Sequence, residues 1–126
     1  MRRAAALYLV IESTGIVVWW VALVVSPAVR RHFVAAGAPD AVLLAFAPAD
    51  LLLVLTGLLA ARSLQRPSKS GARWLCAHAA MAVYAGLYAV GLPLAGGGAW
   101  LGALFMVPVL LISPAIAWRF AGSEER

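Results

Sequence analysis

The sequence has little of what a water-soluble domain needs. Only 12% of its 126 residues are charged, whereas 64% are hydrophobic and the mean hydropathy is +0.94. A soluble domain is nearer a quarter charged, because its surface must face water. The composition therefore excludes an ordinary soluble globule and favours a membrane protein.

Residues that bind metals or form covalent intermediates are also scarce. The single cysteine, Cys76, excludes an intramolecular disulfide, and we expect it to be a small packing residue. The two histidines and the acidic residues show no metal-ligand spacing, and the chain has neither a glycine-rich phosphate loop nor a serine elbow. The sequence thus predicts no metal site and identifies no cofactor. The chemistry that the sequence still allows is that of carboxyl groups in apolar surroundings.

What the sequence does have is four apolar blocks, each long enough for a helix that crosses ~30 Å of hydrocarbon at 1.5 Å per residue. We predict spans at 4–25, 41–61, 74–90 and 100–120 within a single domain, 1–126. The predicted fold class is an all-α, integral membrane four-helix bundle. Tryptophans near the span ends are typical of interfacial anchors; they are Trp74, Trp100 and Trp118.

The basic residues indicate the orientation of these spans. Eight of the ten lie near the N-terminus, in the loop 62–73 or near the C-terminus, and only Arg30 and Arg31 lie in the loop after the first span. The positive-inside rule then predicts a multi-pass protein of the cytoplasmic membrane with both termini cytoplasmic. The amphipathic stretch 29–34 can lie on the outer membrane surface. No basic stripe is interleaved with aromatic residues, so the lipid bilayer, not nucleic acid, is the expected partner.

Several residues are expected to shape the spans. Asp40 is expected to cap the second span and Pro48 to kink it. The third span is expected to end at 91–93, and Pro108 and Pro114 are expected to bend the fourth.

Two acidic residues lie inside the apolar blocks. By helical rise, Glu12 lies about 12 Å and Asp50 about 18 Å from the cytoplasmic boundary. An isolated carboxylate at that depth costs at least ~2.5 kcal/mol, so we expect both to face a shared interior cavity as candidate catalytic residues. Structural roles stay open: Glu12 can hydrogen-bond Ser13, Thr14 or a neighbouring helix, and Asp50 can satisfy backbone groups near Pro48.

Candidate ligand-binding residues accompany these acids. Tyr8 lies four residues before Glu12 on the same helical face, and Pro108 can shape a pocket. His78 lies about 6 Å inside the third span by helical rise, with Tyr88 further along that span. We name Tyr8, His78, Tyr88 and Pro108 as ligand-binding candidates, although a packing or interfacial role is expected more often for a histidine at the depth of His78.

The segment 31–61, RHFVAAGAPDAVLLAFAPADLLLVLTGLLAA, resembles the DoxX-like family of small four-span bacterial membrane proteins. The resemblance rests on Phe33, Gly37, Pro39 and Asp50, with aspartate where glutamate is more familiar. It implies a subunit associated with membrane redox chemistry, linked to thiosulfate or quinones. Glu12 lies outside the resemblance.

Two further resemblances keep other functions open. An intramembrane acid followed closely by glycine is similar to small multidrug transporters, which exchange protons for lipophilic cations. Acids from separate helices in one lipid-facing pocket are similar to sterol isomerase-like proteins. The sequence therefore predicts a binder of a quinone- or isoprenoid-like molecule, in a homodimer or membrane complex. An acid/base enzyme, isomerase- or cyclase-like, and a proton-coupled exporter remain alternatives.

Overall fold

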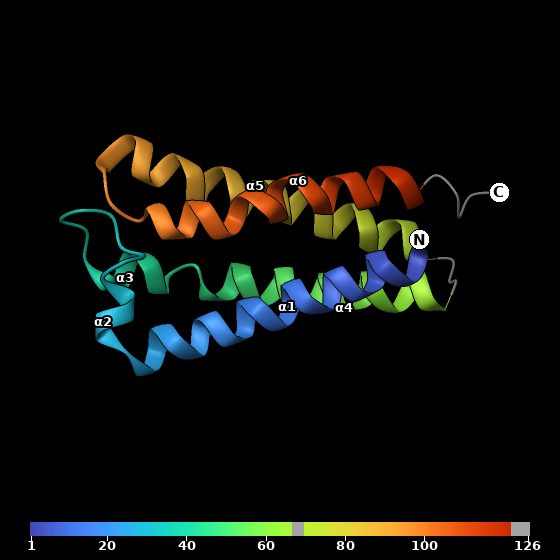
Figure 1. Ribbon diagram of the computed structural model, residues 1–126, viewed down its shortest axis with the longest axis horizontal. Helices are drawn as coiled ribbons and strands as arrows, with labels where there is room; N and C mark the ends of the chain where they lie inside the picture. The colour runs from blue at the N-terminus through green and yellow to red at the C-terminus, as the bar shows by residue number, and fades with distance from the viewer. Residues whose placement is uncertain (67–69, 122–126) are drawn as a thin grey trace.

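The computed structural model describes residues 1–66 and 70–121, and in this part of the chain the regular structure is helical (Figure 1). Four segments are long and apolar enough to cross a membrane, one of them formed by α3 and α4 together. This confirms the predicted all-α bundle of four long segments. The helices are α1 (Arg2–Val25), α2 (Pro27–Arg30), α3 (Asp40–Leu44), α4 (Ala47–Gln65), α5 (Gly71–Gly96) and α6 (Trp100–Ala121).

The long helices run alternately up and down along the molecule. α1 packs on α4, α4 on α5 and α5 on α6, whereas α1 and α6 make few contacts. The N-terminus and the end of α6 lie at one end of the bundle, and α2 and α3 lie at the other (Figure 1). The α1–α4 pair and the α5–α6 pair diverge toward the end that carries α2 and α3 (Figure 1).

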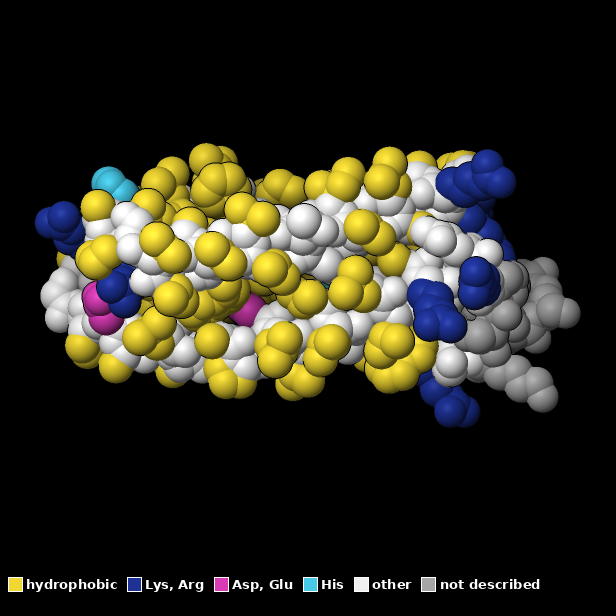
Figure 2. All heavy atoms as spheres, turned by 90° about the horizontal axis from the view of Figure 1, so that it is seen from below, with side chains coloured by type: hydrophobic (Ala, Val, Ile, Leu, Met, Phe, Trp, Pro, Cys, Tyr) yellow, Lys and Arg dark blue, Asp and Glu magenta, His cyan; other side chains and the backbone are white. Residues whose placement is uncertain are grey.

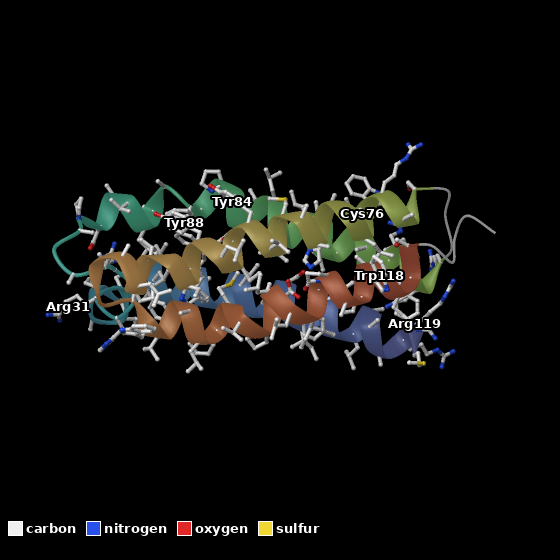
Figure 3. All side chains as sticks on the ribbon, turned by 90° about the horizontal axis from the view of Figure 1, so that it is seen from above. Arg31, Cys76, Tyr84, Tyr88, Trp118 and Arg119 are labelled. Atoms are coloured by element: carbon white, nitrogen blue, oxygen red, sulfur yellow. The ribbon has the colours of Figure 1, made fainter. Side chains whose placement is uncertain are left out.

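Charge and apolar surface are separated along the bundle. Lysine and arginine side chains gather mainly at one end, and hydrophobic side chains cover the length between the ends (Figure 2). Trp118 and Arg119 lie near one end, and Arg31 lies near the other (Figure 3). An apolar belt bounded by basic residues is the surface expected of a protein that spans a bilayer.

The largest cluster of buried hydrophobic residues lies toward the end of the bundle that carries the N-terminus and the end of α6. Small residues allow close approach where dispersion, not water exclusion, must hold helices together. Gly86 serves the same purpose further along α5, because a Cβ there would lie 2.7 Å from the Cβ of Leu110. The cluster comprises Ala5, Ala6, Leu9, Ala60, Ala61, Leu64, Leu75, Ala79, Ile116 and Ala117.

The third span is longer than predicted. α5 begins at Gly71 and continues through Pro93 to Gly96, so the expected end at 91–93 is wrong. Leaving the helix at that point would expose backbone polar groups, which is costly in apolar surroundings. The helix ends instead where Gly97 adopts a φ of 71°, with its N–H donating to the Pro93 carbonyl at 3.0 Å.

The second span is interrupted before Pro48, not at it. α3 ends at Leu44, and Pro48 occupies the first turn of α4, where a missing N–H leaves no helical bond unmade. The predicted cap is also wrong, because Pro39 is the N-cap residue and Asp40 makes no capping hydrogen bond. The Asp40 carboxylate lies 3.5 Å from Nε of Arg30 instead. Pro108 and Pro114 both lie inside the continuous helix α6.

The loop between α1 and α3 closes the end of the bundle. The Ala36 N–H donates to the Gly97 carbonyl at 3.1 Å, which ties this loop to the turn before α6. Gly98, with a φ of 77°, allows the two loops to approach, because a Cβ there would lie 3.0 Å from the Ala36 nitrogen. Phe33 is buried, so the stretch around it is part of the bundle.

Cys76 is exposed on α5. The expectation that it is a small packing residue is therefore wrong. In a helix that is apolar all round, the residue type alone does not show which face points inward.

Candidate functional site

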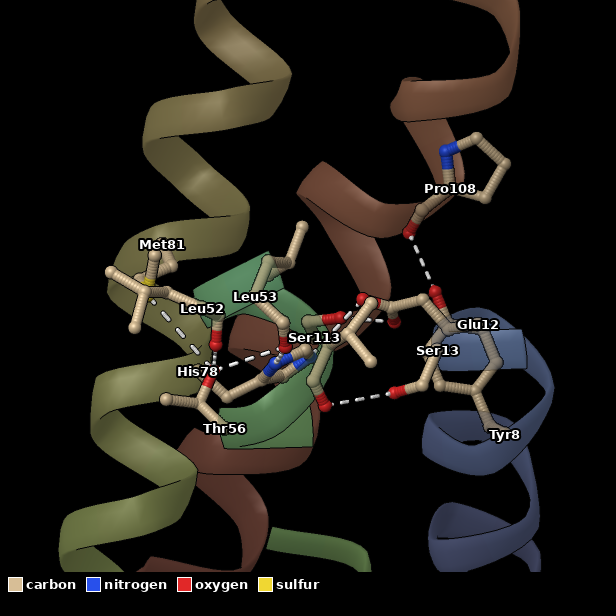
Figure 4. Close-up of polar contacts among 11 residues, drawn as sticks. Tyr8, Glu12, Ser13, Leu52, Leu53, Thr56, His78, Met81, Pro108 and Ser113 are labelled. Carbon is tan, nitrogen blue, oxygen red and sulfur yellow. Dashed lines mark hydrogen bonds and ion pairs between the residues drawn. The ribbon is translucent and has the colours of Figure 1, made fainter. Parts of the chain in front are cut away.

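Glu12 lies in the interior of the bundle and receives contacts from two other helices (Figure 4). Its exposed fraction is 8%. The Ser113 hydroxyl on α6 donates to Glu12 Oε2 at 2.8 Å, and Nε2 of His78 on α5 lies 3.1 Å from Oε1. The partner that sequence analysis proposed on a neighbouring helix is thus a serine and a histidine from two helices.

The orientation of His78 is set from its other ring nitrogen. Nδ1 lies 3.2 Å from the Leu53 carbonyl of α4, and a carbonyl oxygen can only accept, so Nδ1 carries a hydrogen. Nε2 then faces Glu12 Oε1. Neither atom has an aligned hydrogen bond among the described residues, so their contact is electrostatic.

His78 is fully buried, with 1% of its surface exposed. The prediction of a shallow position was wrong because α5 begins at Gly71, about one turn before the expected start. Seven residues of helical rise place His78 about 10 Å along α5 and bring it level with Glu12. It is thus a partner of the acid, not an interfacial residue.

Gly57 on α4 leaves the space that allows Ser13 of α1 and His78 of α5 to approach α4. A Cβ at this position would lie 2.7 Å from the Ser13 hydroxyl oxygen and 3.1 Å from Cε1 of His78. The Ser13 hydroxyl donates to the Val54 carbonyl at 3.4 Å, so it binds the α4 backbone and not Glu12. Sequence analysis missed Gly57 and Ser113. Their signal was small residues within apolar spans, a type enriched where membrane helices meet.

Asp50 has a separate partner. The Trp20 indole N–H on α1 donates to Asp50 Oδ2 at 2.8 Å. Asp50 is partly exposed, so only Glu12 of the two acids is buried. Sequence analysis left open a structural role for Asp50 at the backbone near Pro48. The structure shows instead that Asp50 bonds to another helix, α1.

Tyr8 and Pro108 come together across α1 and α6. The Tyr8 hydroxyl donates to the Pro108 carbonyl at 3.3 Å (Figure 4). Tyr88 on α5 packs against Phe46, with ring centroids 4.3 Å apart and the ring planes tilted by 41°. These residues are therefore held by contacts between elements that are distant in the chain.

A cavity of about 530 Å³ connects most of the predicted residues. Tyr8, Glu12, Asp50, Tyr88 and Pro108 all line it, and the remaining lining is almost entirely apolar. His78 is the exception among the candidates, since it lies behind Glu12 and not in the cavity wall. No lysine or arginine lines the cavity. Among residues 1–66 and 70–121, no three His, Cys, Asp or Glu side chains gather as a metal site would require.

No family model, no curated protein and no solved structure matches this chain. The DoxX-like resemblance therefore stays a prediction, and the function must be argued from the site.

Gly57→Ala tests whether the site depends on this close approach. We expect the added methyl to displace Ser13 and His78 and to lower the stability by about 1–3 kcal/mol, the usual cost of overpacking. Thermal unfolding in detergent measures the loss. Gly91→Ala is the matched control, because a Cβ at Gly91 meets nothing within 4 Å. Equal unfolding temperatures for the two variants would show that Gly57 does not position the site.

Proposed function

We propose that this protein is a multi-pass protein of the cytoplasmic membrane that binds a lipophilic small molecule between its four spans. The observation that carries this proposal is the cavity of about 530 Å³ with two carboxyl side chains in an otherwise apolar wall. Small-molecule sites are commonly 300–1,000 Å³ in volume and combine apolar walls with a few polar groups. The cavity has both properties.

The charge of the lining favours a particular class of ligand. Two acids and no basic side chain line the cavity, so an anionic head group would be repelled. A neutral head group with a carbonyl or hydroxyl oxygen can instead hydrogen-bond at the Glu12 end of the cavity. The aromatic residues Phe46 and Tyr88 offer flat surfaces for a ring or an unsaturated chain. A quinone- or isoprenoid-like molecule has this combination.

The DoxX-like resemblance supports a redox-associated accessory role. Phe33 and Asp50, two residues on which it rests, both line the cavity. A quinone held there would lie beside Glu12, where proton exchange can accompany electron transfer supplied by another subunit.

A second candidate is acid/base catalysis on a lipophilic substrate. The observation that favours it is the fixed hydrogen on Nδ1 of His78, which turns Nε2 toward Glu12. A general acid or base must lie within hydrogen-bond reach of the proton it transfers, and Glu12 lies in the cavity wall. In this reading Glu12 is the catalytic residue and His78 is its positioning partner.

Glu12→Gln tests the binding proposal. The amide keeps an oxygen that can accept from Ser113, so we expect an unchanged fold, but it removes the exchangeable proton. Binding of a benzoquinone with a ten-carbon tail, measured by tryptophan fluorescence quenching in lipid nanodiscs, should weaken about tenfold or more, as expected when a hydrogen bond to a charged group is lost.

Asp50→Asn is the matched control, because its amide oxygen can still accept from Trp20. We expect this variant to bind the quinone nearly as well as the wild type. Full binding by Glu12→Gln together with loss in Asp50→Asn would withdraw Glu12 as the principal site. Native mass spectrometry of gently extracted protein should independently show a co-purified lipophile, and an empty antiparallel dimer would favour the exporter.

Topology provides a further test. In a Cys76→Ala background, we expect an impermeant maleimide added to intact cells to label His32→Cys and not Gln65→Cys, because both positions are exposed but lie at opposite ends of the bundle. The positive-inside rule places the end with Gln65 in the cytoplasm. Labelling of Gln65→Cys in intact cells contradicts the proposed orientation.

A further inference from the structure

Beside the cavity, polar and ring contacts among the described residues join α1 and α6 at a lower and an upper level of the bundle. At the lower level, Tyr8 bonds to Pro108 and Glu12 bonds to Ser113. At the upper level, Phe33 joins the helices, with its ring centroid 5.4 Å from that of Trp19 and 6.3 Å from that of Phe105.

Between these levels the two helices are not sealed. Apart from the Tyr8–Pro108 bond, whose acceptor lies five residues before Ser113 on α6, no hydrogen bond or ring contact joins α1 directly to α6 above Glu12 in the described part of the chain. Overall, α1 and α6 make far fewer contacts than the other neighbouring pairs of long helices. The wall of the cavity is therefore weakest on this side.

Three residues identify an opening there. Ile11, Val18 and Phe105 line the cavity, yet 61%, 62% and 62% of their surfaces are exposed. A side chain that lines an internal cavity and also faces the exterior must lie at its mouth. Gly15 lies between Ile11 and Val18 on the same helical face, at spacings of four and three residues. We call this opening, bounded by Ile11, Gly15, Val18 and Phe105, the lateral mouth.

The lateral mouth lies at the depth of the bilayer. Counting from the start of α1, Ile11 is about 13 Å and Val18 about 24 Å along the helix axis, so the mouth is about 10 Å tall. These residues fall within the apolar stretch of α1 that is long enough to cross a membrane. The mouth therefore opens toward acyl chains, not toward water.

We infer that the ligand enters sideways from the bilayer through the lateral mouth and that Gly15 sets its width. This inference rests on the proposed function and deepens it. The ligand is then a membrane-dissolved lipophile with a neutral head and a single chain, not a water-soluble molecule. Its head lies near Glu12, and the cavity between the levels of Tyr8 and Ala22, about 21 Å apart along α1, accommodates its chain.

A competing route exists on the other side of α1. A groove of about 400 Å³ between α1 and α4 is lined by Val21 and Trp20, and it shares Ile16 and Asp50 with the cavity. The hydrogen bond from Trp20 to Asp50 joins the two helices at this shared wall. Passage there requires that bond to break, whereas no hydrogen bond joins the residues that bound the lateral mouth, and the Tyr8–Pro108 bond lies beside it.

Gly15→Phe tests the inference. A Cβ at Gly15 meets nothing within 4 Å, so a larger side chain can begin there without a clash at its first atom and extend across the mouth. Stopped-flow measurements with the decyl-tailed benzoquinone in nanodiscs should show association and dissociation both slowed about tenfold, with Kd nearly unchanged, because a narrowed entrance raises the barrier in both directions. Val21→Phe is the control, since Val21 is exposed in the competing groove and does not line the cavity.

Each contrary outcome has a definite meaning. Slow binding by Val21→Phe with normal rates for Gly15→Phe assigns entry to the competing groove and overturns the inference. A raised Kd with an unchanged association rate in Gly15→Phe makes Gly15 a ligand contact and also overturns it. If the wild-type protein does not bind the quinone, the proposed function is overturned in its quinone-binding form, and the inferred entry route falls with it. If Gly15→Phe does not fold, Gly15→Leu carries the same test.

Discussion

A single carboxyl side chain in the interior of an apolar bundle imposes the main constraint on this protein. A charged group at the centre of a bilayer costs at least ~2.5 kcal/mol unless partners compensate for it. Glu12 obtains those partners from Ser113 on α6 and His78 on α5, and His78 is held in turn by the Leu53 carbonyl on α4. One acid thereby links all four long segments at the same depth.

The cavity follows from where these polar contacts lie. They join α1 to α6 at mid-depth, and Phe33 joins them again near the end that carries α2 and α3. Gly57 draws α4 against His78 and Ser13, so the remaining neighbours are packed closely. The space between the two levels on the α1–α6 side is left open as a consequence.

The two intramembrane acids have different surroundings and therefore different capabilities. Glu12 is buried beside Nε2 of His78, and Nδ1 of the same ring bonds to the Leu53 carbonyl. Asp50 is partly exposed and accepts from an indole N–H, which holds α1 and α4 together. Under the proposed function, proton exchange with a bound lipophile falls to Glu12, whereas Asp50 is a second carboxyl group in the cavity wall.

Composition alone determined the four long helices and marked Glu12 and Asp50, because crossing hydrocarbon requires about 20 apolar residues and any acid there is costly. Only the tertiary structure decided that His78 meets Glu12 and that Cys76 faces outward. Helices that are apolar on every side have no polar face from which their rotation can be read. Which face of each helix points inward, and how the helices align along their length, depend on close packing at small residues such as Gly57. This packing exists only when the four segments are assembled.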